Sequence, residues 1–189
     1  RAAATGGGVT STDTRLRDGS TVAIIGGGPG GVACALRLAR QPASAGRRLR
    51  VVLFEGKDFD RHYNQCVGVL SPPVEEVLQT ELGLSLPREL LKRRIFGYRL
   101  HVGRNRVFLV EDDVAGPTYT VRRVKFDQFL LAEAERAGVE VVRSRATSVE
   151  FARRGGLDEV RVYSESQSLR ADVVVGAFGL DEAMLSVFE

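Results

Sequence analysis

The stretch Gly26-Gly27-Gly28-Pro29-Gly30-Gly31 decides the fold of this chain. It follows the apolar run Thr21-Val22-Ala23-Ile24-Ile25 and opens a helix-like stretch from Val32 to Arg40. The next apolar run, Val51-Val52-Leu53-Phe54, ends at the acidic residue Glu55. A glycine-rich turn between a strand and a helix, followed by a second strand that ends in a carboxylate, is the arrangement that holds the ADP part of a dinucleotide.

Each glycine of this turn has a separate task. Gly26 lets the chain turn sharply off the strand, Gly28 leaves room for a diphosphate, and Gly31 lets the helix pack closely on the sheet. Pro29 has no N–H, which suits the first helical position, and the free amides around Gly30 face the anion together with the helix dipole. A purely structural turn that binds nothing is the alternative, but it does not need all three glycines.

Glu55 indicates the kind of dinucleotide. Its carboxylate can accept hydrogen bonds from both ribose hydroxyls and repels a 2′-phosphate. We therefore expect a nucleotide with an unphosphorylated adenosine ribose, such as FAD or NAD.

Composition is ordinary for a globular chain of 189 residues, with 43% hydrophobic and 27% charged residues and a net charge of +3. The basic clusters are scattered and lack interleaved aromatics, so no nucleic-acid partner is expected. Lys92-Arg93-Arg94 is a weak hint of peripheral contact with an anionic membrane. Two cysteines, Cys34 and Cys66, and the lack of an apolar run of membrane length favour a cytoplasmic location.

The rest of the chain predicts further helices and strands. A helix capped by Ser71, with Pro72 at its first position, buries Val74, Val77, Leu78 and Leu82 and stops at Gly83. A short helix is expected at 87–93, and a clear helix at 125–137. Strands are expected within 95–111 on either side of a turn at 103–105, at 139–142, as a hairpin at 146–152 and 159–164, and at 172–176, the last buried on both faces.

The insertion between Glu55 and the helix at 125–137 is too long for a simple NAD domain, and the hairpin before residue 172 is foreign to that fold. The predicted fold class is therefore α/β: an FAD-binding, Rossmann-like, three-layer ββα sandwich with an inserted helical and antiparallel β region. We expect a flexible lead-in at 1–20, the FAD-binding domain at 21–180 with an insertion at 56–122, and the start of a C-terminal part at 181–189. The chain is expected to be incomplete at its C-terminus.

Residues 21 to about 180 resemble the FAD-dependent reductases of the geranylgeranyl reductase group, within the p-hydroxybenzoate hydroxylase-like fold. Besides the glycine turn and Glu55, the resemblance rests on the segment Asn64-Gln65-Cys66-Val67-Gly68-Val69-Leu70-Ser71-Pro72, which is similar to that group's Cys-Gly-Gly-Gly-Leu-Ser-Pro. It rests further on Arg123-x-x-Phe126-Asp127-x-x-Leu130 and on the strand end at 171–179. The chain departs from the pattern at Val67 and Val69, which replace glycines, and at Phe178, which replaces an acid and puts a nicotinamide contact there in doubt.

The resemblance implies which residues contact FAD. Cys66, Val67 and Gly68 would line the flavin side, Arg123 the phosphates, and Ala146 the adenine. A buried inert thiol remains an equal interpretation for Cys66, and a surface arginine an alternative for Arg123. The full predicted set of cofactor-binding residues is Gly26, Gly28, Pro29, Gly30, Gly31, Glu55, Gly56, Cys66, Val67, Gly68, Arg123 and Ala146.

The function implied is an FAD-dependent oxidoreductase that reduces a carbon–carbon double bond of an isoprenoid-type substrate with NAD(P)H-reduced flavin. Oxygen activation is a weaker variant. An NAD-dependent dehydrogenase and a non-catalytic FAD-binding fragment are the alternatives. No side chain stands out as a catalytic acid or base, and His62 and His101 lack metal-ligand neighbours in the sequence, so no metal site is expected. His62-Tyr63 could donate a proton beside Cys66, although a surface loop is the favoured interpretation.

Overall fold

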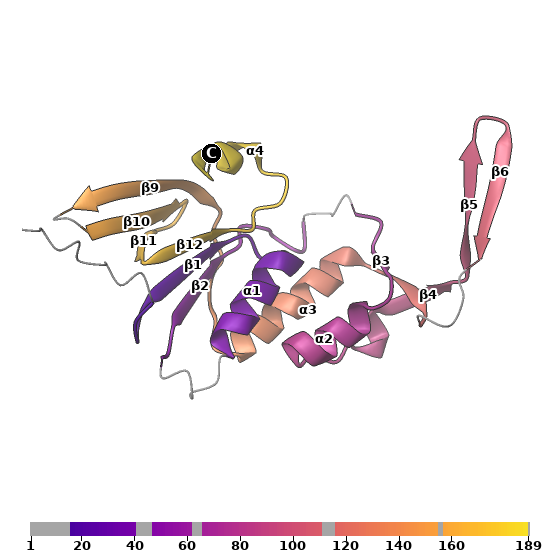
Figure 1. The fold of residues 1–189 in the computed structure, drawn as a ribbon, viewed down its shortest axis with the longest axis horizontal. Helices are drawn as coiled ribbons and strands as arrows, with labels where there is room; N and C mark the ends of the chain where they lie inside the picture. The colour runs from indigo at the N-terminus through magenta and orange to yellow at the C-terminus, as the bar shows by residue number, and fades with distance from the viewer. Residues whose placement is uncertain (1–15, 41–46, 62–65, 111–115, 155–156, 189) are drawn as a thin grey trace, which may run out of the picture.

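The computed structural model describes residues 16–40, 47–61, 66–110, 116–154 and 157–188. A parallel sheet in the order β12-β1-β2-β8 forms its centre (Figure 1). Its strands are β1 (Thr21–Ile25), β2 (Arg50–Phe54), β8 (Glu140–Val142) and β12 (Val173–Gly176). Ile25 of β1 pairs with Phe54 of β2, so the strand ends that precede the glycine turn and Glu55 lie side by side.

Two different layers cover the two faces of this sheet. Helices α1 (Pro29–Ala39) and α3 (Arg123–Arg136) pack on one face, and the antiparallel sheet of β9 (Ala146–Arg154), β10 (Leu157–Ser164) and β11 (Ser168–Ala171) lies on the other (Figure 1). Side chains alternate between them: Val22 and Ile24 join the helix-side core, whereas Ala23 and Ile25 join the core beneath β9–β11. The predicted three-layer ββα sandwich is confirmed.

The region between Glu55 and α3 adds a second, smaller sheet, a helix and a two-stranded arm to the structure. Strand β3 (Val69–Leu70), β7 (Thr118–Val121) and β4 (Leu91–Ile95) form a sheet in the order β3-β7-β4, and α2 (Val74–Leu82) packs beside α1. Strands β5 (Gly97–Val102) and β6 (Asn105–Val110) form a two-stranded arm that projects from the molecule (Figure 1). The predicted turn at 103–105 is thus confirmed.

Several predicted details of this region are wrong. The helix begins at Val74 with Pro73 at its N-cap and no side-chain cap, so Ser71 does not cap it. Val77 is 44% exposed, since the buried stripe is narrower than the sequence suggests, although Gly83 does end the helix in the left-handed conformation. The helix expected at 87–93 is a single 3₁₀ turn at Arg88–Leu90, because Leu91 and the residues after it pair with β7.

The C-terminal part also differs in detail. Strand β12 is an edge strand of the parallel sheet, and its valines pack against the cores on both faces, as predicted, but they are only half-buried. Strand β11 was not expected, and α4 (Glu182–Phe188) follows β12 within the segment predicted to start a further part. Of the predicted lead-in, residues 1–15 lie outside the described residues, and Leu16 packs against the core.

Among the helices that the structure describes, none combines the length and the apolar character needed to cross a bilayer.

Candidate functional site

The glycine turn between β1 and α1 is built by close backbone contacts. Gly26 has a φ of +108°, a conformation in which a side chain is strained, and a Cβ there would overlap the carbonyl oxygen of Ala177. A Cβ on Gly31 would overlap the carbonyl oxygen of Gly26. In contrast, a Cβ on Gly28 or Gly30 would meet no atom within 4 Å. Gly26 and Gly31 therefore serve packing, whereas Gly28 and Gly30 face open space.

That open space is a crevice of about 1060 Å³ at the carboxyl ends of β1, β2 and β12. This edge of a parallel sheet is where ligands bind in open α/β folds. The predicted site residues that line it are Gly26, Gly28, Pro29, Gly30, Glu55, Gly56, Cys66, Arg123 and Ala146. Gly31 is buried behind the turn, and Val67 and Gly68 are not part of the lining.

Glu55 is held in place by backbone amides. Gly27 N–H donates to its Oε2 at 2.9 Å, and Lys57 N–H donates to its Oε1 at 2.7 Å. A Cβ on Gly27 would lie 2.8 Å from the Cβ of Glu55, so the turn and the carboxylate fit only when residue 27 is glycine. Gly56 also allows a close approach of two segments, because a Cβ there would lie 2.6 Å from the Cβ of Arg145. Glu55 thus has a fixed orientation before any ligand arrives, and each carboxylate oxygen keeps a further lone pair.

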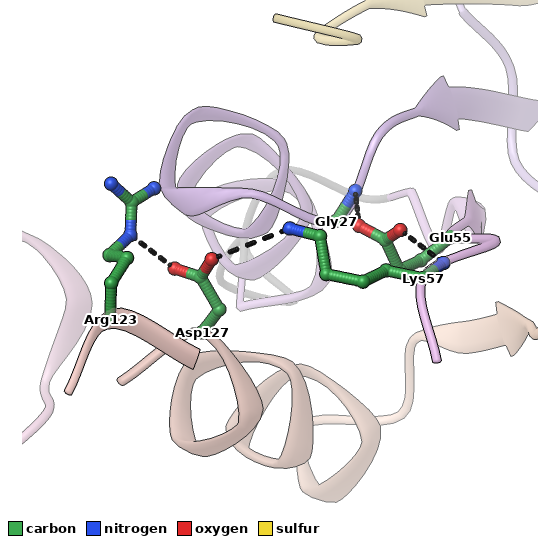
Figure 2. A network of polar contacts seen from close by, with 5 residues as sticks. All are labelled: Gly27, Glu55, Lys57, Arg123 and Asp127. Carbon is green, nitrogen blue, oxygen red and sulfur yellow. Dashed lines mark hydrogen bonds and ion pairs between the residues drawn. The ribbon is translucent and has the colours of Figure 1, made fainter. Parts of the chain in front are cut away.

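A polar network joins Glu55, Lys57, Asp127 and Arg123 (Figure 2), all of which line the crevice. Arg123, at the start of α3, donates from Nε to Asp127 Oδ1 at 2.7 Å, and Lys57 Nζ lies 3.7 Å from Asp127 Oδ2. Asp127 is almost fully buried, and the Arg123 and Lys57 side chains are 25% exposed. The sequence predicts Arg123 as a site residue but not Lys57 or Asp127, because the ion pair of these two joins segments far apart in the chain.

Cys66 lies at the same end of the crevice as Arg123. Its Sγ accepts a hydrogen bond from Gly68 N–H at 3.4 Å, and this bond together with the Arg123 guanidinium lowers the pKa of the thiol. Val67 is 84% exposed, and Gly68 has a φ of +74° at a position where a Cβ would overlap the Val121 carbonyl oxygen. Cys66 is exposed and lines the crevice, so the alternative of a buried thiol is wrong. His62 and Tyr63 lie outside the described residues.

The crevice is also lined by Ala146 and by the segment between β12 and α4. Arg145 donates to Asp181 Oδ2 at 2.7 Å, and this hydrogen bond lowers the pKa of the Asp181 carboxyl. The Phe178 ring lies 5.5 Å from that of Phe188, in α4. Arg145 and Asp181 were not foreseen, since neither stands in a recognisable sequence pattern.

In the part of the chain that the structure describes, no three His, Cys, Asp or Glu side chains gather as a metal site. His101 lies on β5, in the projecting arm.

The sequence of the chain is similar to those of known flavoproteins and related oxidoreductases. Residues 20–132 match the family model of the pyridine nucleotide-disulphide oxidoreductases. The chain is 31% identical over 177 residues to the probable electron transfer flavoprotein-quinone oxidoreductase YgcN of Escherichia coli, covering 89% of this chain and 38% of that protein.

Solved structures agree in fold. A myxobacterial chondrochloren halogenase, described as a variant of FAD-dependent halogenases, is 28% identical with a TM-score of 0.67 over 90% of this chain and 39% of that one. A geranylgeranyl bacteriochlorophyll reductase-like protein from Thermoplasma acidophilum is 23% identical with a TM-score of 0.63, over 92% of this chain and 42% of that one. The chain therefore spans about two fifths of the length of these proteins.

Proposed function

The chain belongs to the pyridine nucleotide-disulphide oxidoreductase family, and from that premise we propose that it forms the FAD-binding part of an enzyme that reduces a carbon–carbon double bond of an isoprenoid-type substrate. It is a member of the flavin-dependent oxidoreductases, and FAD is its cofactor. The double-bond chemistry and the isoprenoid class are the proposal. They are supported by the sequence motifs shared with geranylgeranyl reductases and by the fold shared with a reductase-like protein.

The observation that carries the FAD-binding part of the proposal is the open face of the glycine turn. Gly28 and Gly30 leave space on the crevice side, whereas Gly26 and Gly31 are closed by backbone atoms. The α1 N-terminus begins there at Pro29 without a side-chain cap, so its first amides are available to an anion. Glu55, fixed by two amides, stands at the end of the neighbouring strand. These residues fit the diphosphate and ribose of FAD.

Within such an enzyme the residues of this chain bind and orient. Glu55 accepts hydrogen bonds from ribose hydroxyls, the turn places amides against the diphosphate, and Ala146 leaves a small apolar wall for the adenine. Cys66 lies on the side assigned to the flavin, and the neighbouring Arg123 is assigned to the phosphates. When bound, the flavin supplies hydride transfer between a nicotinamide donor and the substrate.

A second candidate is a flavin-dependent oxidoreductase that passes electrons to a quinone. It is favoured by the 31% identity to the protein named as a probable electron transfer flavoprotein-quinone oxidoreductase. The NAD-dependent dehydrogenase alternative has less support, because the β9–β11 layer and the long insertion match flavoprotein neighbours.

The test is a titration of the purified chain with FAD, NAD and ADP. We expect FAD to bind and its visible absorbance band to shift, and ADP to compete for the same site. Tighter binding of NAD than of FAD, or binding of FAD without competition by ADP, would overturn the assignment. Anaerobic addition of NAD(P)H to the FAD-loaded chain, followed by an isoprenoid alkene or by a quinone, then decides between the two acceptors.

A further inference from the structure

Asp127 is an unusual residue to find in the lining of this crevice. Only 1% of its surface is exposed, and its carboxylate meets two cations from different elements. Arg123 lies one helical turn earlier on α3, and Lys57 follows β2. A buried carboxylate is stable only when its charge is compensated, and here each of its two oxygens has its own cationic partner.

Lys57 connects this carboxylate to Glu55. Its backbone N–H donates to Glu55 Oε1 at 2.7 Å, while its Nζ lies 3.7 Å from Asp127 Oδ2. Figure 2 shows the Lys57 side chain extended from the Glu55 end of the network to Asp127. The position of the lysine is therefore fixed at both ends, by the ribose-binding carboxylate and by α3.

Lys57, Arg123 and Asp127 together carry a formal charge of +1, and all three line the crevice together with Gly28 and Gly30. The glycine turn offers amides to an anion from one element, and the two cations come from two others. A ligand with a diphosphate next to a ribose matches this distribution of charge.

We infer that Asp127 is a positioning residue that holds Lys57 and Arg123 as a pair of cations for the diphosphate of the bound dinucleotide. This inference rests on the proposed function. Asp127 itself makes no contact with the ligand, because its carboxylate is buried and engaged by the two side chains that it orients. Lys57 thereby becomes a phosphate-binding residue in addition to Arg123.

The direction in which one substitution changes the affinity for an anion distinguishes this inference from two simpler explanations. Asp127→Asn removes a negative charge from the crevice and preserves the size of the side chain. Through-space electrostatics alone predicts tighter binding of an anion to this variant. A role confined to bracing α3 against β2 predicts lower thermal stability with unchanged ligand discrimination. Loss of positioning predicts weaker binding of the anion, although a negative charge has gone.

The experiment measures dissociation constants of ADP and of adenosine by calorimetry for the full chain and its variants. The ratio of the two constants isolates the contribution of the diphosphate. We expect Asp127→Asn to reduce the preference for ADP over adenosine by about 10-fold, with the adenosine constant unchanged, because two charge-assisted contacts lose their geometry. Lys57→Gln is expected to reduce the preference by a similar factor. Because both substitutions disturb the same contact, the double variant should reduce it by less than the product of the two single factors.

Lys125→Gln is the matched control. Lys125 is exposed on the first turn of α3, pairs with Gln128, and lies outside the crevice lining, so the ratio should not change. If Asp127→Asn does not fold, an unchanged preference for ADP in Lys57→Gln still overturns the inference. An unchanged or increased preference for ADP in these variants overturns the inference while the proposed function stands. A wild-type chain that binds neither ADP nor FAD overturns both.

Discussion

We propose that nucleotide selection depends on Glu55, whose carboxylate accepts hydrogen bonds from two backbone amides. Glu55→Arg removes an acceptor for the ribose and places a cation against Gly27 N–H and Lys57 N–H. We expect FAD to bind at least about 10-fold more weakly, as followed by fluorescence titration. Glu76→Arg, an equivalent change on the exposed face of α2, is the control and should leave the affinity unchanged. Equal affinities of the Glu55 variant and the wild type would contradict the ribose contact.

The two cysteines are predicted to differ in reactivity. The Gly68 amide and Arg123 lower the pKa of the Cys66 thiol, whereas burial raises the pKa of the Cys34 thiol. Because the thiolate is the reactive form, a lower pKa moves the pH midpoint of alkylation downward. Iodoacetamide should therefore modify Cys66, measured in a Cys34→Ala background, at lower pH than Cys34 in a Cys66→Ala background. Arg123→Gln should raise the Cys66 midpoint, and a midpoint that does not move would disprove the electrostatic cause.

At the scale of elements, the start of α1 offers a matched pair of glycines. Gly31→Ala forces a methyl group into the carbonyl oxygen of Gly26, and we expect the free energy of unfolding in urea to fall by about 1–3 kcal/mol. Gly30→Ala adds the same methyl group in open space one residue earlier, and alanine is the better helix former, so stability should change by less than about 1 kcal/mol. Equal losses of unfolding free energy in the two variants would show that the close contact between Gly31 and the Gly26 carbonyl oxygen does not limit stability.

Elements were predictable from sequence where local chemistry decides them. The positive φ of Gly26 and the contact of Gly31 with the Gly26 carbonyl oxygen are local, so the strand, turn and helix could be placed correctly. The segment after Leu91 was misjudged because its pairing with β7 overrides its local preference. Asp127 could be assigned to a helix but not to the crevice, since its partner Lys57 is brought close only by the packing of α3 beside the end of β2.

At the scale of the whole molecule, the β5–β6 arm projects from the rest of the structure (Figure 1). The side chains on its two faces differ. Leu100 pairs with Val107 and Tyr98 with Leu109, so these side chains share one apolar face, and all four are more than two fifths exposed. Arg99 and Phe108 pair on the opposite face, where the guanidinium lies 4.8 Å from the ring centroid. The molecule therefore presents an apolar surface on an element remote in sequence from the glycine turn.

This surface should be the principal binding site for the apolar dye anilinonaphthalene sulfonate. Replacing Leu100 and Leu109 together by Thr keeps a strand-forming side chain and removes the apolar contact, so dye fluorescence should fall by at least about half. The matched control replaces His101 and Arg106, a pair on the opposite face, by Thr and should leave the fluorescence unchanged. ADP affinity should be the same in both double variants, since the arm does not line the crevice. Unchanged dye binding after the leucine substitutions would mean that the apolar face is covered in solution.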